Sequence, residues 1–185
     1  MLVHLSALLM VTTSAASGLK MANKYDPEVA DAARKCCPSS AFACCAEAIE
    51  FYRPLACPSI QRGEEEKTMR CIQSSLFGAA DTNATGIDHM PCCSVFLHDQ
   101  TDPDARCYQR CQQILRTPSR SSEQKLRYLS LCRLDNSLLP CFNGCVEDVY
   151  LHSEKGLPMD QFHFEEPKEC TQMKKKGEAH KPIIQ

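Results

Sequence analysis

Apolar residues recur at helical spacing along most of the chain, and strand-like alternation is nearly absent. In the first part, the pattern predicts one helix that begins at Asp26-Pro27 and a second that Ser40 caps and that ends before Pro54. A third helix is expected over residues 64–77, with Gly78 after its end. Residues 79–86 have no such stripe, so we expect them to form an exposed loop.

The second part of the chain carries three further helical patterns. Asp102-Pro103 opens the most regular one. Ser121 and Gln124 form a capping-box pattern before the next, and Pro140 starts a last helix that runs to about residue 150. The pattern then fades, so residues 151–185 are expected to be a polar, partly disordered tail. The predicted fold class is mainly α, a small irregular helical domain of five or six short helices.

The N-terminus has the pattern of a signal peptide. Residues 1–17 contain no acidic residue, lysine or arginine, and an apolar run over residues 5–11 is followed by small residues. Ala15 and Ser17 would occupy positions −3 and −1 of the cleavage site. Later stretches are too short and too polar to span a bilayer. We therefore expect a secreted, extracellular product with one module over residues 26–150, its core over 36–145, and the tail over 151–185.

Fourteen cysteines define the class more firmly than any other part of the composition. Such a number is rare in a reducing cytosol and ordinary in secreted domains. The number is even, so every thiol can be paired in six or seven disulfides. The residues expected to form them are Cys36, Cys37, Cys44, Cys45, Cys57, Cys71, Cys92, Cys93, Cys107, Cys111, Cys132, Cys141, Cys145 and Cys170.

The spacing of the cysteines predicts how they connect the helices. Three doublets occur, at 36-37, 44-45 and 92-93. Neighbouring side chains on a helix diverge by about 100°, so each doublet is expected to tie three segments together. Cys107/Cys111 and Cys141/Cys145 lie on one helix face each, and we expect both members of such a pair to bridge to the same neighbouring helix.

The order of the cysteines repeats across the two halves, and the second half resembles a known family. Each half has a doublet followed by four single cysteines, which leaves Cys145 and Cys170 over; we expect these two to pair with each other. Asp88-His89-Met90-Pro91-Cys92-Cys93, Cys107-x-x-x-Cys111, Tyr128-Leu129-Ser130-Leu131-Cys132 and Cys141-Phe142 resemble the nematode cysteine-rich DB module. That resemblance implies a secreted or cell-surface module with six disulfides, no known catalysis and contacts with extracellular proteins.

One segment invites comparison with an enzyme. Secreted phospholipases follow a cysteine doublet with His-Asp, and here Cys92-Cys93 precedes His98-Asp99. Four residues separate the doublet from His98 instead of two, which turns the imidazole by about 200° on a helix, and no Gly-rich calcium loop is present. We expect His98 to be exposed at a helix end and Asp99 to lie in the following turn.

No other residue pattern points to catalysis, a metal or a cofactor. Cys-x-x-Cys, His-x-x-x-His and Gly-x-Ser-x-Gly are all missing from the sequence. We therefore predict no catalytic residue, no metal ligand and no cofactor. The formal net charge of −2 gives no basic field for nucleic acid.

Two surface features remain as candidates for recognition or modification. Six arginines between residues 106 and 133 could form a basic face for an acidic partner or a sulfated glycan: Arg106, Arg110, Arg116, Arg120, Arg127 and Arg133. Asn83-Ala84-Thr85 is an N-glycosylation sequon, and Asn83 is the predicted acceptor.

The sequence indicates a non-enzymatic module that binds another extracellular or cell-surface protein. The alternative is a secreted phospholipase-like or lipid-binding helical protein. A third class, a disulfide-rich protease inhibitor, would use an exposed loop at Arg116–Arg120.

Overall fold

The computed structural model describes residues 24–61, 63–132 and 138–175, so the predicted signal peptide lies outside the described residues. Within these ranges the chain is helical and contains no strand. Its elements are α2 (Pro27–Cys36), η1 (Ser39–Ala41), α3 (Phe42–Glu50), α4 (Glu65–Phe77), α5 (Ala79–Ala84), η2 (Ile87–Phe96), α6 (Arg106–Leu115), α7 (Ser122–Ser130), α8 (Leu139–Glu154), η3 (Met159–Gln161) and α9 (Lys168–Lys175). The predicted mainly α fold is confirmed.

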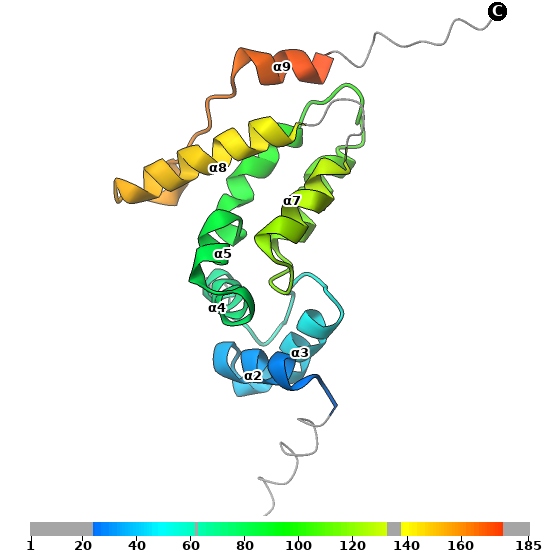
Figure 1. The fold of residues 1–185 in the computed structure, drawn as a ribbon, viewed down its shortest axis with the longest axis vertical. Helices are drawn as coiled ribbons and strands as arrows, with labels where there is room; N and C mark the ends of the chain where they lie inside the picture. Colours follow the sequence, from blue (N-terminus) through cyan, green and yellow to red (C-terminus); the bar gives the residue numbers. More distant parts are fainter. Residues whose placement is uncertain (1–23, 62, 133–137, 176–185) are drawn as a thin grey trace, which may run out of the picture.

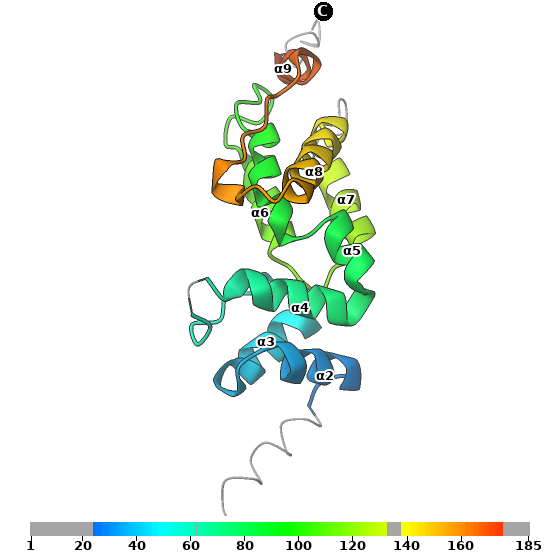
Figure 2. The same cartoon turned by 90° about the vertical axis from the view of Figure 1, so that its left-hand side faces the viewer.

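The molecule is elongated and has two apolar clusters instead of one core. Figures 1 and 2 show α2 and α3 at one end, α4 next to them toward the middle of the molecule, and α9 at the other end. The first cluster involves residues 25–87 and the second residues 92–170. We call residues 24–78 the first half and residues 87–175 the second half; α5 lies between them.

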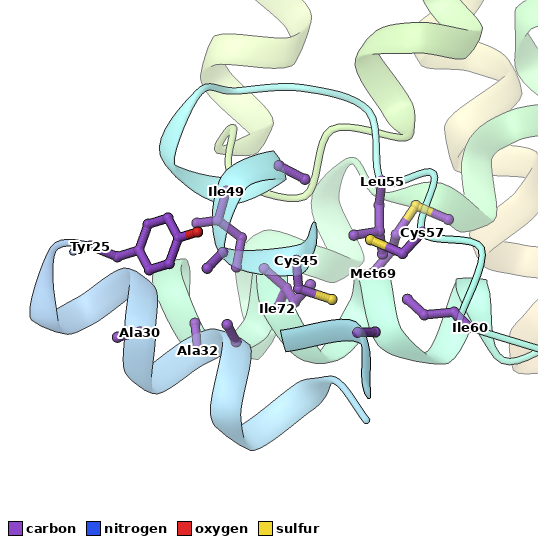
Figure 3. Packing of buried hydrophobic residues seen from close by; sticks show 14 of the residues in the cluster. Tyr25, Ala30, Ala32, Cys45, Ile49, Leu55, Cys57, Ile60, Met69 and Ile72 are labelled. Atoms are coloured by element: carbon purple, nitrogen blue, oxygen red, sulfur yellow. The ribbon is translucent and has the colours of Figure 1, made fainter. Parts of the chain in front are cut away.

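The first cluster is made largely of small side chains, as Figure 3 shows around α2, α3 and α4. Ala32, Ala33, Cys45 and Ala46 are almost completely buried, and Ile72 of α4 packs among them. Alanines bury little apolar area each, so this half gains less from the hydrophobic effect than a core rich in Leu or Phe would. Its disulfides accordingly matter more for stability.

A buried group of polar side chains connects the two halves. Lys125 of α7 is fully buried, and its ammonium donates to Oε1 of Gln73 at 2.5 Å and to the Thr85 carbonyl at 3.4 Å. The amide of Gln73 donates to Oδ2 of Asp81 at 2.9 Å, and the Ser122 N–H donates to the same carboxylate at 3.0 and 3.1 Å. We call these five residues the polar joint. Burial lowers the pKa of Lys125 to about 8, and the Asp81 carboxylate partly opposes that shift.

Several helix ends lie where the sequence placed them. Asp26 caps α2, with its Oδ1 accepting from the Glu28 N–H at 2.9 Å and Pro27 as the first helical residue. Ser121 and Gln124 form the predicted capping box of α7, and Gly78 follows the end of α4 with a φ of 88°. These are ends where a side chain or a glycine satisfies the local backbone.

Three expectations about elements are wrong. Ser40 does not cap α3, because it lies inside the short η1 turn and Ala41 precedes the helix. Residues 79–86 are not an exposed loop, because residues 79–84 form α5, and Thr82, Thr85 and Gly86 are buried. Asp102-Pro103 does not open α6, which starts at Arg106, although Oδ2 of Asp102 accepts from the Cys107 N–H at 2.7 Å.

Residues 151–175 depart from the expected polar, partly disordered tail. They complete α8 and form η3 and α9. The Cys141–Cys170 disulfide fastens α9 to α8, and Phe162 and Phe164 pack against the second apolar cluster. A cystine and two aromatic rings therefore hold a segment whose composition is otherwise polar.

Candidate protein-binding surface

The covalent framework consists of seven disulfides, three in the first half and four in the second. All fourteen cysteines take part. The pairs are Cys36–Cys71, Cys37–Cys45, Cys44–Cys57, Cys92–Cys145, Cys93–Cys111, Cys107–Cys132 and Cys141–Cys170. Among the described residues no disulfide joins the two halves, so α5 and non-covalent contacts hold them together, among them the polar joint and the ion pair of Arg70 with Asp88 at 3.0 Å.

Each doublet connects three segments, as the divergence of neighbouring side chains predicted. Cys92 bonds to α8 while Cys93 bonds to α6. In the first half, Cys36 at the end of α2 bonds to α4, and Cys37 next to it bonds to α3. Adjacent cysteines therefore act as branch points of the framework.

Two pairing expectations are wrong. Cys145 does not bond to Cys170; it bonds to Cys92, and Cys170 bonds to Cys141. The i, i+4 pairs also do not bridge to one neighbour each. Cys107 and Cys111 share a face of α6, yet α6 packs between the end of α7 and η2, so its two cysteines reach different partners.

Aromatic and arginine side chains gather where the first half meets α7, around a half-buried Arg120. The Arg120 guanidinium lies 5.1 Å from the ring centre of Tyr52 and 4.2 Å from that of Tyr128. Beside it, the Arg53 guanidinium lies 5.4 Å from the ring of Phe51. We call these five residues the aromatic patch. Tyr52 and Phe51 are more than half exposed, at 53% and 57%.

Tyr52 has an uncommon backbone conformation. Its φ of 51° lies in the left-handed region, just after α3 ends, where chains usually place glycine. The Tyr52 N–H donates to the Ile49 carbonyl at 3.3 Å and the Arg53 N–H to that of Ala48 at 2.9 Å. The conformation ends the helix and leaves the phenol ring exposed. A bulky residue in a strained, exposed position is a candidate for function.

Both disulfide-bonded halves support the patch. The Cys44–Cys57 disulfide closes the loop that carries residues 51–53, and the Leu55 N–H donates to the Arg116 carbonyl at 2.9 Å. Tyr and Arg are the residue types most enriched at the energetic centres of protein interfaces. Because the loop is held in place before binding, a partner would have little of it left to order.

The predicted arginine cluster is only partly one surface. Arg120 belongs to the aromatic patch, whereas Arg106 pairs with Asp104 at 2.8 Å at the start of α6. Arg116 and Arg127 are exposed, as is Arg110. Arg133 lies outside the described residues. The charge pattern pointed to Arg120, but no pattern in the sequence pointed to Tyr52 or Tyr128 as residues of a binding surface. Their one signal was that these two of the five tyrosines lie near helix ends.

The residues of the rejected enzyme comparison do not form a shared site. His98 is exposed with a φ of 59°, as expected after the end of η2. Asp99 is buried, and its Oδ1 accepts from the N–H and hydroxyl of Thr101 at 2.9 and 2.7 Å. In the described ranges, histidines, cysteines and acidic residues form no group of three that could hold a metal ion.

The predicted glycosylation site lies at the surface. Asn83 is exposed on α5, and its sequon partner Thr85 is buried. Glycosylation of Asn83 stays a prediction.

The loop considered for protease inhibition has Thr117, Pro118 and Ser119 buried, so it is not an exposed loop. No helix in the part of the chain that the structure describes has the length and apolarity to cross a bilayer.

Comparison with known proteins gives one consistent result. A family model described as Caenorhabditis elegans Her-1 matches residues 24–178. The Caenorhabditis elegans protein her-1 is 31% identical over 151 residues, covering 80% of this chain and 83% of its own. The crystal structure of C. elegans HER-1 superimposes with a TM-score of 0.64 at 29% identity, covering 76% of this chain and 96% of that chain.

These matches refine the resemblance inferred from the sequence. They support a cysteine-rich helical family of nematodes, but they do not confirm the DB module, which the cysteine spacing had suggested. The match extends beyond the expected core of residues 36–145 at both ends and includes the segment that carries α9. The chain belongs to the Caenorhabditis elegans Her-1 family.

Proposed function

We propose that this protein is a secreted, non-enzymatic module that binds another extracellular or cell-surface protein through the aromatic patch. The observation that carries the proposal is the stack of Arg120 between Tyr52 and Tyr128, which a strained backbone and a disulfide-closed loop keep exposed. Seven disulfides and the pattern of residues 1–17 support the extracellular location.

The phospholipase-like or lipid-binding alternative has less support. Its catalytic dyad would need His98 and a carboxylate facing a common cavity, yet Asp99 is buried in its own turn. A second group of exposed apolar residues lies near the end of α8: Tyr150, Leu151 and Leu157. In the part of the chain that the structure describes, the cation–π contacts involve other rings. This second group therefore supplies a matched control surface.

The test is a binding screen of the secreted protein against a library of extracellular domains, repeated with Tyr52→Gly. Glycine suits a φ of 51°, so this variant should fold with an unfolding free energy within about 1 kcal/mol of the parent. We expect it to bind the partner at least ten-fold more weakly, because the Arg120 stack loses one ring. Thermal unfolding and surface plasmon resonance measure the two effects.

The control is Tyr150→Ala, which removes a tyrosine of similar exposure on α8 and should leave affinity unchanged. A partner that binds Tyr52→Gly normally and loses affinity for Tyr150→Ala would move the binding surface to α8. Turnover of an ester substrate that His98→Ala abolishes, with no partner in the screen, would favour the enzyme alternative.

A further inference from the structure

A pocket lies beside the aromatic patch and has its own character. It has a volume of about 330 Å³ and lies between the start of α2, the end of α3 and the end of α4. Ile49 and Leu76 supply apolar wall, and the rings of Tyr52 and Phe77 flank it. That volume equals roughly ten water molecules in the liquid, ample for one long side chain.

The charged residues that line the pocket in the described part of the chain are all acidic. They are Asp26, Glu28 and Glu50, and no described lysine or arginine lines it. The three are close together, since Oε2 of Glu50 accepts from the Asp26 N–H at 3.4 Å and Oδ1 of Asp26 from the Glu28 N–H at 2.9 Å. Within the described ranges none of these carboxylates forms an ion pair, and the nearby Lys24 pairs with Glu47 instead.

Local structure accounts for two of these carboxylates but not for the third. Asp26 and Glu28 lie at the N-terminus of α2, where the helix dipole favours negative charge. Glu50 is the last residue of α3, where the dipole disfavours it. A cation in the pocket would offset that cost.

Ser119 adds an independent observation. It lines the pocket from the loop before α7 and is only 4% exposed. Its Oγ has no hydrogen-bond partner among the described residues. Buried hydroxyls are normally paired, so this one is available to a polar group that enters the pocket.

We propose that this pocket receives an arginine side chain of the protein partner. A guanidinium fits better than an ammonium because its planar fork can meet several carboxylates at once and its face stacks on Tyr52 or Phe77. Its aliphatic stem would contact Ile49 and Leu76. The inference rests on the proposed function and makes it specific: the partner contributes a basic residue beside the surface that contacts the aromatic patch.

The pocket can be tested without the partner. The disulfide-bonded protein is titrated with Nα-acetyl-arginine methylamide, and amide chemical shifts are followed by NMR up to 50 mM probe. We expect saturable shifts at Tyr52, Phe77 and Ser119. The citrulline analogue, which is neutral and nearly isosteric, should bind at least ten-fold more weakly. Glu50→Gln should weaken arginine binding about three- to ten-fold, whereas the control Glu123→Gln on α7 should not change it.

Each other outcome overturns the proposal. Equal binding of arginine and citrulline, shifts that map elsewhere, or no saturation at 50 mM would show that the pocket has no preference for a guanidinium. A dimer in sedimentation that Glu50→Gln dissolves would assign the pocket to a second copy of this chain. The screen above is independent, so a partner that binds through the patch while the probe fails would leave the proposed function intact.

Discussion

At the residue scale, Lys125 is the clearest case of a side chain whose burial costs free energy and also fixes the position of a helix. Removing an ammonium from water is unfavourable unless its donors find acceptors. Lys125 reaches the Gln73 amide oxygen and the Thr85 carbonyl, and the Asp81 carboxylate lies in the same cluster. These acceptors belong to α4, α5 and the C-cap of α5, so the buried charge fixes where α7 lies relative to the first half. A hydrophobic side chain at position 125 would cost less free energy to bury. It would need none of these acceptors, however, and so would fix the position of α7 less strictly.

This burial predicts a particular pH dependence. The pKa of Lys125 is about 8 in the folded protein against an ordinary value of 10.5. Between these two values the unfolded chain holds a proton that the folded chain has released, so the free energy of unfolding rises with pH. The rise should approach about 3 kcal/mol at most from pH 8 to 10.5. Chemical denaturation of the oxidised protein at several pH values measures it.

Lys125→Met is the control for that experiment. It keeps a side chain of similar length without the titrating group, so the rise should disappear while the smaller contributions of other groups remain. An identical pH dependence in the parent and the variant would show that Lys125 does not carry the effect.

At the scale of elements, the helix ends show which boundaries could be predicted from the sequence and which could not. Asp26 and the Ser121/Gln124 box were predictable because their signals are local and the structure uses them. Ser40 carried a similar signal but lies within η1, where neighbouring cystines set the path of the chain. α5 was missed because its buried residue, Thr82, is polar, and because the Thr85 carbonyl at its end accepts from Ser122 and Lys125 of α7.

The capping box gives a prediction at this scale. Oγ of Ser121 accepts from the Gln124 N–H at 3.3 Å, and the Gln124 side chain accepts from the Ser121 N–H at 3.1 Å. Ser121→Ala should lower the free energy of unfolding by about 1 kcal/mol. Ser40→Ala is the matched control and should change it little, because the exposed Ser40 caps no helix. Equal losses would mean that the α7 cap contributes nothing of its own.

The candidate site shows what residue patterns cannot reveal. Arg120 stood out as part of a charge cluster, yet its stacking partners come from residues far apart in the sequence, at the end of α3 and in α7. The pairing of Cys141 with Cys170 also depended on where α9 packs. Helix existence and doublet geometry follow from local spacing, whereas partners across the fold follow from tertiary packing.

At the scale of the whole molecule, the division into two covalent units is the main feature. The disulfides of the first half end at Cys71 and those of the second begin at Cys92. The aromatic patch takes Tyr52 from one unit and Tyr128 from the other. Its geometry therefore depends on α5 and the polar joint, neither of which contains a cysteine.

Cleavage of the chain tests this division. Gly78 and Gly156 are both exposed with positive φ, and a protease site inserted at either should be cut. After a cut at Gly78, denaturing electrophoresis without reductant should give two separate fragments. After a cut at Gly156 the fragments should stay together until reduction, because Cys141–Cys170 spans that site. One band in the first case would require a disulfide between the halves.

The uncrosslinked stretch also determines how the molecule would respond to mechanical tension applied at its two ends. The disulfides Cys36–Cys71, Cys92–Cys145 and Cys141–Cys170 carry the tension past most of each half, whereas residues 72–91 have no crosslink and can be drawn out. Fully extended, that segment spans roughly 70 Å. A pulling force would thus lengthen the protein at its centre and separate Tyr52 from Tyr128 while both clamped ends kept their shape.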